Sequence, residues 1–367
     1  LPDLVSGFGR RVLLVSGRDT ARFAGLVDAL RAAGLEVSRE SIPGEPTVDQ
    51  VAAIVGRART AAPAAVIAIG GGSVVDAGKA VAALVANTGD ILDYLEVVGR
   101  GQPIEKPPLP FIAVPTTAGT GAEVTRNAVL GVPSARVKAS MRHPSMLPAI
   151  ALVDPALTLS VPPAVTAATG MDALTQLIEP FLCRRATPLT DALCRDGIPR
   201  VARALPVAFR EPSNRAARVN LSLGALYSGL ALANAGLGAV HGFAAPIGGA
   251  FPAPHGAVCA ALLPHVLEAN LTALRAGGTA TAPFLQRFDE LARLLTGRQD
   301  ATAEDAVAWT AILARELQIP PLSHWGIREQ DIPGLVSRAR QASSMKANPV
   351  ALSDEALSTI VRRAIAA

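Results

Sequence analysis

The first 155 residues alternate between short apolar runs and helical stretches, and this alternation limits the possible folds more than any other feature. The runs that predict strands lie at residues 11–15, 35–42, 64–69, 110–114 and 149–153. The stretches with helical periodicity lie at residues 20–33, 47–60 and 74–87. Strands joined in this way by short connections and helices pair in parallel. The pattern therefore predicts an α/β domain with a parallel sheet covered on both faces.

The sequence pattern changes after Asp154 and Pro155, from alternating strand-like and helical segments to helical segments alone. From about Pro163 onward, long amphipathic or apolar stretches follow one another, punctuated by proline and glycine, and none has the pattern of a strand. We therefore expect two domains, an α/β domain over residues 1–157 and an all-helical domain over residues 158–367. A chain of 367 residues also exceeds what one hydrophobic core usually serves.

Composition excludes several classes of protein. Half of the residues are hydrophobic and 17% are charged, which is typical of a folded globular chain. The net charge of +4 is small, and no stretch concentrates Lys and Arg around aromatic residues, so we expect no nucleic-acid partner. No apolar run is long enough to span a membrane, and no secretion leader is evident. Three cysteines without a Cys-x-x-Cys pair favour a reducing compartment, the cytoplasm.

Two polar turns follow predicted strands. The first, Gly70 to Ser73, opens a helix, so its backbone amides and the helix dipole suit a pyrophosphate. The second runs from Pro115 to Gly121 and carries Thr116, Thr117 and Thr120. Ligands of open α/β sheets bind outside the carboxyl ends of the strands, where both turns are expected. The turns therefore predict a dinucleotide site, although the usual Gly-x-Gly-x-x-Gly pattern is absent.

The helical half carries candidate metal ligands. Asp172 and Gln176 are four residues apart, which places both on one helix face, and Glu179 follows near that face. His241 and His255 each precede a glycine in apolar surroundings. Oxygen and imidazole ligands suit a divalent ion such as iron or zinc, which can polarise a carbonyl group as a Lewis acid. A buried histidine can equally be a core residue, and we assign only structural roles to His143, His265 and His324.

Three stretches give the chain a family resemblance. They are Gly-Gly-Gly-Ser-Val-Val-Asp-Ala-Gly-Lys at 70–79, Pro-Thr-Thr-Ala-Gly-Thr-Gly-Ala-Glu-Val-Thr at 115–125, and the two His-Gly pairs within 241–256. In order and spacing the chain resembles the iron-containing (group III) alcohol dehydrogenases, from about residue 11 to its end. That family shares its fold with dehydroquinate synthase and glycerol dehydrogenase. The resemblance implies an active site in the cleft between the two domains, and a homodimer.

The resemblance also implies roles for individual residues. Those expected to bind NAD or NADP are Gly17, Gly71, Gly72, Ser73, Asp76, Thr116, Thr117, Thr120 and Lys138. Among these, the three residues 71–73 and Asp76 would meet the pyrophosphate and nicotinamide side. The three threonines would line the nucleotide, and Lys138 would reach the ribose. The family's metal ligands fall on Asp172, His241 and His255, which would also be the catalytic residues.

Three positions depart from the family pattern. Gln176 stands where the family has its first metal histidine, and Ala245 stands where it has a histidine often assigned to proton relay. An amide oxygen is a weaker ligand for iron or zinc than imidazole, so the site could bind a metal loosely, bind none, or use a different ion. At the end of the first strand the family often has an aspartate that repels a 2′-phosphate. Here Gly17 and Arg18 take its place and would tolerate NADPH.

These observations predict an NAD(P)-dependent dehydrogenase or reductase acting on a small alcohol, aldehyde or ketone. A metal-independent reductase of the maleylacetate type, with an anionic substrate, is the main alternative. A lyase of the dehydroquinate synthase type is disfavoured, because the helical half lacks the many Lys and Arg residues that a phosphorylated sugar acid requires. A nucleotide-binding module without catalysis is the remaining alternative.

Overall fold

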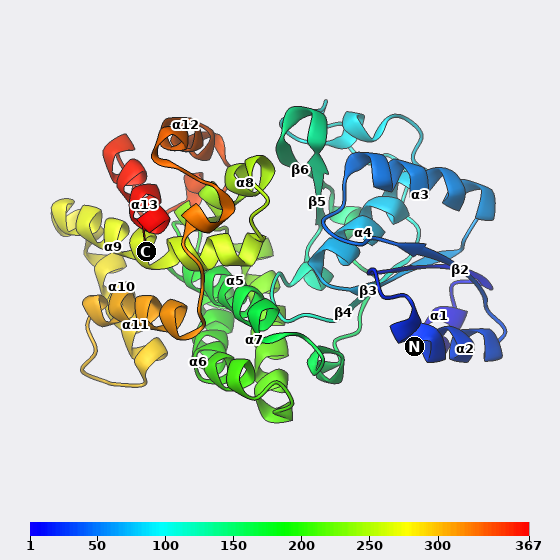
Figure 1. Cartoon of the computed structure of the whole chain (residues 1–367), viewed down its shortest axis with the longest axis horizontal. Helices are drawn as coiled ribbons and strands as arrows, with labels where there is room; N and C mark the ends of the chain where they lie inside the picture. Colours follow the sequence, from blue (N-terminus) through cyan, green and yellow to red (C-terminus); the bar gives the residue numbers. More distant parts are fainter. Residues whose placement is uncertain (367) are drawn as a thin grey trace. The chain divides into compact units, whose positions relative to one another are not determined.

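Two units with different secondary structure make up the chain in the computed structural model, which describes residues 1–366 (Figure 1). One unit comprises Leu1–Thr117 and Ala122–Leu157, and it contains every strand of the described residues. The other comprises Ala118–Gly121 and the chain from Thr158 onward, and its regular structure is helical. The predicted fold class, an α/β domain with a parallel sheet followed by an all-helical domain, is confirmed.

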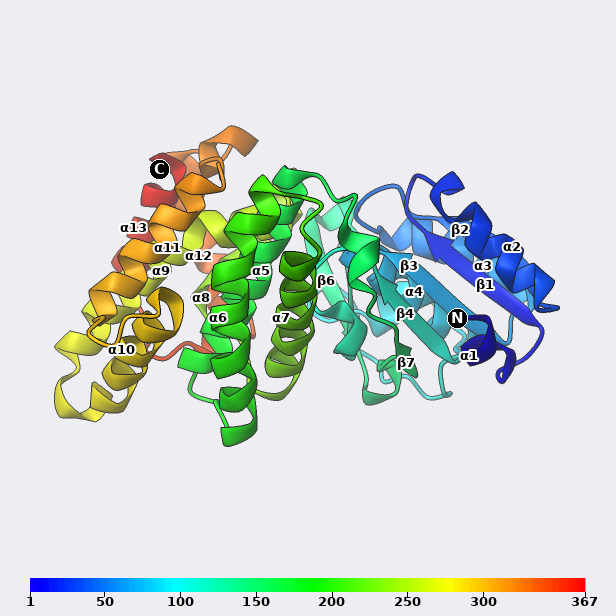
Figure 2. The same ribbon diagram turned by 90° about the horizontal axis from the view of Figure 1, so that it is seen from below.

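The sheet of the α/β unit is parallel throughout. Its strands are β1 (Arg11–Ser16), β2 (Glu36–Ser41), β3 (Ala65–Gly70), β4 (Phe111–Pro115) and β7 (Ile150–Ala151). They lie in the order β2-β1-β3-β4-β7, which Figure 2 shows side by side. All five were predicted. Only the last is much shorter than expected, since two residues of the run 149–153 pair with β4.

Helices cover both faces of the sheet, because successive side chains of a strand point in opposite directions. Leu13 and Val15 of β1 pack in a cluster with residues of α3 (Val48–Ala61) and α4 (Gly72–Ala86). Val12 and Leu14 pack in a second cluster with residues of α1 (Pro2–Ser6) and α2 (Ala24–Ala32). Strands buried on both faces have continuous apolar sequences, which is why β1, β3 and β4 were recognisable.

A β-hairpin in the α/β unit was not predicted. Strands β5 (Asn127–Val132) and β6 (Val137–Arg142) pair antiparallel, with alternate residues of β5 buried. The ammonium group of Lys79 lies beside the start of this hairpin and is fully buried. It donates to the carbonyl oxygens of Ala122 at 2.9 Å and Asn127 at 2.5 Å, and it pairs with Asp76 at 3.3 Å. These contacts offset the cost of burying the charge and fix the loop that enters β5.

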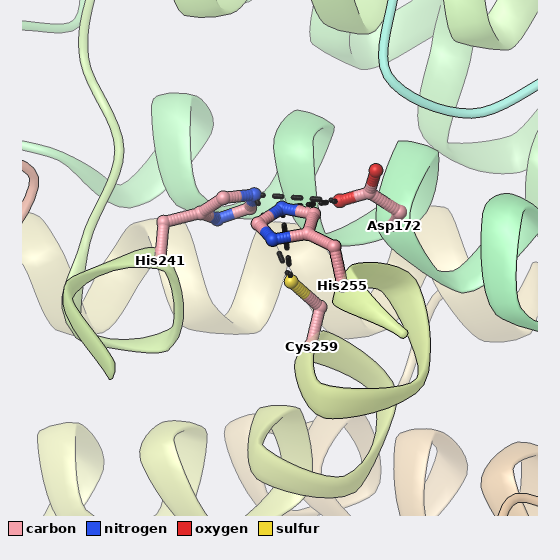
Figure 3. Close-up of side chains that lie close together, drawn as sticks. All are labelled: Asp172, His241, His255 and Cys259. Carbon is pink, nitrogen blue, oxygen red and sulfur yellow. Dashed lines mark hydrogen bonds and ion pairs between the residues drawn. The ribbon is translucent and has the colours of Figure 1, made fainter. Parts of the chain in front are cut away.

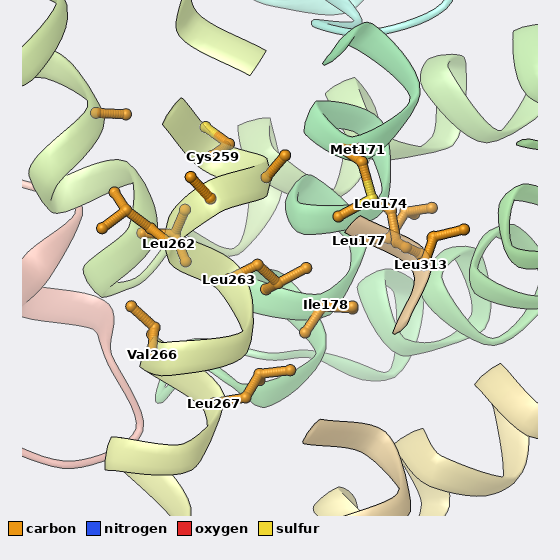
Figure 4. Close-up of a cluster of buried hydrophobic side chains, with 14 of the residues drawn as sticks. Met171, Leu174, Leu177, Ile178, Cys259, Leu262, Leu263, Val266, Leu267 and Leu313 are labelled. Atoms are coloured by element: carbon orange, nitrogen blue, oxygen red, sulfur yellow. The ribbon is translucent and has the colours of Figure 1, made fainter. Parts of the chain in front are cut away.

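The helical unit is built around two long buried helices. Its helices are α5 (Pro163–Leu182), α6 (Pro188–Arg210), α7 (Arg215–Asn234), α8 (Ala239–Ala250), α9 (His255–Ala276), α10 (Ala282–Thr296), α11 (Ala303–Glu316), α12 (Ile332–Gln341) and α13 (Asp354–Ala366). Leucines and an isoleucine of α5 face leucines of α9 across the core (Figure 4). Helix α9 is long and apolar enough to cross a membrane. However, 72% of its most apolar window is buried within the structure, which is typical of a core helix.

The close packing of α4 on the sheet depends on Gly78. A Cβ atom at this position would lie 2.7 Å from the Cβ of Ala68 and 2.7 Å from a ring carbon of Phe111. Gly78→Ala is therefore expected to destabilise the protein by about 1–3 kcal/mol through overpacking. Gly56, in the exposed interior of α3, has no atom within 4 Å of such a Cβ. Gly56→Ala is expected to stabilise by up to about 1 kcal/mol.

Urea denaturation of both variants beside the unsubstituted protein measures the two effects. A free energy of unfolding that changes equally for the two substitutions would contradict the packing role of Gly78.

Candidate functional site

The turn between β3 and α4 lies where the order of the sheet reverses. From β1 the chain moves to β2 on one side and then returns to β3 on the other, so the carboxyl ends of β1 and β3 are neighbours. A crevice at such a switch point is the usual ligand site of open α/β sheets. Gly71 is the N-cap of α4, and no side chain of residues 1–366 caps the helix. Its first amides, on partly exposed residues, are therefore available to an anion.

The close approach of Gly70 to the Val74 side chain requires a residue without a Cβ atom. A Cβ at Gly70 would lie 2.6 Å from the side chain of Val74, so only glycine lets the chain turn this sharply into α4. The side chain of Thr117 lies beside Gly71, since a Cβ there would be 3.4 Å from the threonine Oγ1. The structure thus brings the two predicted turns together at Gly71 and Thr117. The amide of Thr116, which is itself buried, also donates to the carbonyl oxygen of Gly70 at 2.9 Å.

Other predicted nucleotide residues are held by contacts within the protein. Asp76 pairs with Lys79, and it accepts a hydrogen bond from the amide of Val129 at 3.1 Å. Lys138 forms an ion pair with Glu45. The carbonyl oxygen of Gly17 accepts a hydrogen bond from the Ser41 hydroxyl at 3.2 Å. Ser73 is partly exposed in the first turn of α4, and Thr120 belongs to the segment 118–121 that groups with the helical unit.

Four donor side chains converge inside the helical unit (Figure 3). Asp172 comes from α5, His241 from α8, and His255 and Cys259 from α9. One ligand atom of each lies within 4.8 Å of the others. Asp172 Oδ1 is 3.4 Å from Nε2 of His241 and 3.6 Å from Nε2 of His255. The structure therefore brings together three residues that the sequence alone could not place side by side.

Gly256 makes this convergence possible. A Cβ at Gly256 would lie 2.2 Å from the carbonyl oxygen of Ala168, so α9 reaches α5 only because this residue has no side chain. The same contact places its neighbour His255, the first residue of α9, beside Asp172. The pairing of histidine with glycine at 255 and 256 thus has a steric origin.

A carboxylate behind the cluster orients one imidazole. Glu179 lies two turns after Asp172 on α5 and is buried. Its carboxylate accepts hydrogen bonds from the Val240 amide at 2.7 Å and from Nδ1 of His241 at 2.6 Å. With Nδ1 held by Glu179, it is Nε2 that faces Asp172, His255 and Cys259. Such carboxylate–imidazole pairs commonly fix histidine ligands of metals.

Gln176 lies beside the cluster, with its amide nitrogen toward Asp172. That nitrogen is 3.3 Å from Asp172 Oδ1, while its oxygen accepts a hydrogen bond from the Ser228 hydroxyl at 3.1 Å. An ionised carboxylate only accepts hydrogen bonds, so the donor end of the amide must face Asp172. Ala245, the other departure from the family pattern, is exposed on α8.

The charges of the cluster support one another. Burial opposes ionisation of Asp172, but the positive charges of His255 and His241 outweigh it and lower the pKa of the carboxyl group. Burial likewise opposes ionisation of Cys259, and the same histidines lower the pKa of its thiol. Burial disfavours the charged histidines too. Cys259 with Glu179 raises the pKa of His241, and Cys259 with Asp172 raises that of His255. A divalent cation would take over the positive charge that the imidazoles carry in its absence.

Sequence reasoning missed Cys259, although a signal was present. It follows His255 by four residues on α9, the same spacing that drew attention to Asp172 and Gln176 on α5. The remaining histidines lie outside the cluster. His143 caps a short 3-10 turn, His265 is partly buried in α9, and His324 stacks edge-on against Trp325.

The Glu179 carboxylate yields a testable prediction. In Glu179→Gln, an NH₂ group replaces one carboxylate oxygen and faces either the Val240 amide or Nδ1 of His241. Both of these groups donate hydrogen bonds, so one of the two contacts is lost. We expect Zn²⁺ affinity, measured by competition with a chromogenic chelator, to fall by roughly 10- to 100-fold. Glu268→Gln, which alters an exposed carboxylate on α9 paired with Arg363, is the matched control and should bind normally. Equal affinities of the two variants would remove the orienting role of Glu179.

Comparison with known proteins assigns both units to one family. Residues 1–155 match the model of the iron-containing alcohol dehydrogenases, and residues 166–365 match the C-terminal model of the same family. A probable alcohol dehydrogenase of Salmonella typhimurium is 37% identical over 84% of this chain and 74% of its own length. The 1,3-propanediol dehydrogenase of Klebsiella pneumoniae is 34% identical over 97% of this chain and 92% of its own.

A solved structure agrees in fold. The sulfoacetaldehyde reductase of Bifidobacterium kashiwanohense, crystallised with NAD⁺, has a TM-score of 0.84 and 29% identity, covering 100% of this chain and 94% of its own. The resemblance inferred from the motifs is confirmed. The chain belongs to the iron-containing alcohol dehydrogenase family, and it is an oxidoreductase that acts on alcohols or the corresponding carbonyl compounds.

Proposed function

We propose that Asp172, His241 and His255 hold a divalent metal ion and that this centre serves the reduction of a small aldehyde or ketone by NADH or NADPH, or the reverse oxidation. The observation that carries the proposal is the approach of one carboxylate oxygen to two imidazole Nε2 atoms at 3.4 and 3.6 Å. The donor set fits a divalent transition metal, because imidazole and carboxylate suit iron and zinc alike. When bound, the ion would supply Lewis-acid polarisation of the carbonyl group.

The chain's own residues support this chemistry by position. Glu179 keeps the Nδ1 proton of His241 in place, and Gln176 donates a hydrogen bond to Asp172. The imidazole of His255 is 34% exposed, whereas the side chains of Asp172 and His241 are 2% and 5% exposed. A small substrate would therefore approach the cluster from the side of His255. The surrounding apolar core excludes water from the remaining donors, which strengthens their electrostatic effect.

The nucleotide is proposed to bind at the turn after β3. The amides of Gly71, Gly72 and Ser73 at the start of α4 would receive the pyrophosphate, with Thr116 and Thr117 beside them and Thr120 further along the second turn. Asp76 is paired with Lys79, and Lys138 with Glu45. To contact the nucleotide as well, each would have to bind it while keeping or giving up that ion pair. When bound there, the nicotinamide would supply or accept the hydride.

The alternatives find less support. A metal-independent reductase of the maleylacetate type would not require donor atoms to converge as they do around Asp172. The proposed partner is therefore a small alcohol or carbonyl compound. The three cysteines are buried and free, which supports the proposed cytoplasmic location. The homodimer rests on the family resemblance alone.

Removal of the central carboxylate tests the metal site. Asp172→Asn, and chelation of the unsubstituted enzyme, are each expected to reduce kcat/KM with short aldehydes by about 10²-fold or more, the usual effect of losing a stabiliser of developing negative charge. Asp196→Asn changes an exposed carboxylate on α6 that pairs with Arg200, and it should be neutral. The measurement is the rate of NADH or NADPH oxidation, followed by absorbance. Full activity after both chelation and Asp172→Asn would refute the metal proposal.

The end of β1 tests cofactor choice. Gly17 carries no carboxylate to repel a 2′-phosphate, and the Arg18 side chain that follows is exposed. We expect Arg18→Glu to raise KM for NADPH by about 10- to 100-fold, corresponding to one charge-assisted hydrogen bond, and to leave KM for NADH nearly unchanged. Arg31→Glu on the exposed face of α2 is the control for net charge. A parallel change in both KM values would count against the assignment.

A further inference from the structure

Cys259 stands in the cluster as a fourth donor that the family resemblance does not assign. Its Sγ lies 3.8 Å from Nε2 of His241 and 3.7 Å from Nε2 of His255. The residue is fully buried on α9, one turn after His255. The other cysteines have different surroundings. Cys183 follows the end of α5, and burial beside Asp191 raises the pKa of the Cys194 thiol on α6 to about 12.

Four measured separations between the ligand atoms match edges of a tetrahedron around one ion. With metal–sulfur and metal–nitrogen bonds of about 2.3 and 2.05 Å, tetrahedral angles place sulfur about 3.6 Å from nitrogen. The two observed sulfur–nitrogen distances are 3.7 and 3.8 Å. Oxygen and nitrogen ligands should lie about 3.3–3.4 Å apart, and the observed distances are 3.4 and 3.6 Å. Four of the six edges therefore lie within about 0.3 Å of tetrahedral values, and the remaining two are no longer than 4.8 Å.

Gln176, by contrast, is occupied on both sides. Its amide nitrogen donates to Asp172, and an amide nitrogen has no free lone pair for a metal. Its oxygen accepts from the hydroxyl of Ser228. For Gln176 to become a ligand, the amide must rotate, and it then gives up its hydrogen bond to Asp172 and reverses the direction of the one with Ser228. Cys259 Sγ, by contrast, already faces Nε2 of both histidines, and a bound ion would displace only its proton.

We propose that Cys259, and not Gln176, is the fourth protein ligand, so that the ion is held by one carboxylate, two imidazoles and one thiolate. The inference rests on the proposed metal site. Two anionic ligands balance the charge of a divalent ion, and the soft sulfur favours Zn²⁺ or Co²⁺ over Fe²⁺. The chain would thus keep the family's metal position and change its metal preference.

Cobalt reports directly on this ligand. Metal-free full-length protein is titrated with Co²⁺, and the near-ultraviolet spectrum is recorded for a thiolate-to-cobalt charge-transfer band. We expect the band in the unsubstituted protein, in Cys194→Ala and in Gln176→Leu. We expect Cys259→Ala to lose it and to bind Co²⁺ about tenfold or more weakly, as removal of a supporting ligand group typically does. Circular dichroism confirms that each variant is folded.

Several outcomes would overturn the proposal. They are uptake of Co²⁺ by the unsubstituted protein without the band, a band that persists in Cys259→Ala, a band lost in Gln176→Leu, or no uptake of Co²⁺ at all. Should Cys259→Ala fail to fold, the spectra of the unsubstituted protein and of Cys194→Ala still show whether a thiolate binds the cobalt ion and whether it is that of Cys194. NAD(P)H-dependent aldehyde reduction, measured on the same samples, separates this failure from that of the proposed function. If the enzyme is active but shows no charge-transfer band, the proposed function stands and the assignment of Cys259 as a ligand is refuted.

Discussion

The contact between Gly256 and the carbonyl of Ala168 governs the arrangement of the candidate site. Helices rarely approach so closely, and here the missing side chain at one position lets α9 lie directly on α5. Two donors then come from the first turns of α9 and a third from the middle of α5. Any larger residue at 256 would force the helices apart and separate Asp172 from His255. The cluster is thus a result of backbone packing, and its side chains need only ordinary orientations.

Burying this many polar groups in an apolar core is costly, and the structure compensates by giving each a partner. Glu179 accepts hydrogen bonds from a backbone amide and from His241. Asp172 accepts a hydrogen bond from Gln176 and pairs with both histidines. A network satisfied in this way resists rearrangement, because a change at one member leaves a buried neighbour without a partner. The same logic explains Lys79 in the other unit, whose ammonium group is surrounded by carbonyl oxygens at the start of the hairpin.

The sequence predicted what local patterns determine. Strands such as β1 and β3 are continuous apolar runs, and the helical stretch expected over residues 47–60 is α3, which Thr47 caps. The hairpin β5–β6 was missed because only one face of it is buried and its residues include many small and polar types. For the site, spacing placed Asp172 and Gln176 on one face of α5. No local pattern could show that His241 lies against Asp172, since that contact depends on how α8 packs on α5. The orientation of Gln176 depends on Ser228, which is remote in sequence.

All donors of the cluster, together with Glu179 behind it, come from the chain after Thr158. During synthesis the sheet and its glycine turn are therefore complete long before α8 and α9 leave the ribosome, and domains generally fold in that order. Capture of the proposed metal ion would then be a late event in the synthesis of the chain. A ribosome-bound intermediate would already possess the glycine turn while still lacking both histidines of the proposed metal site.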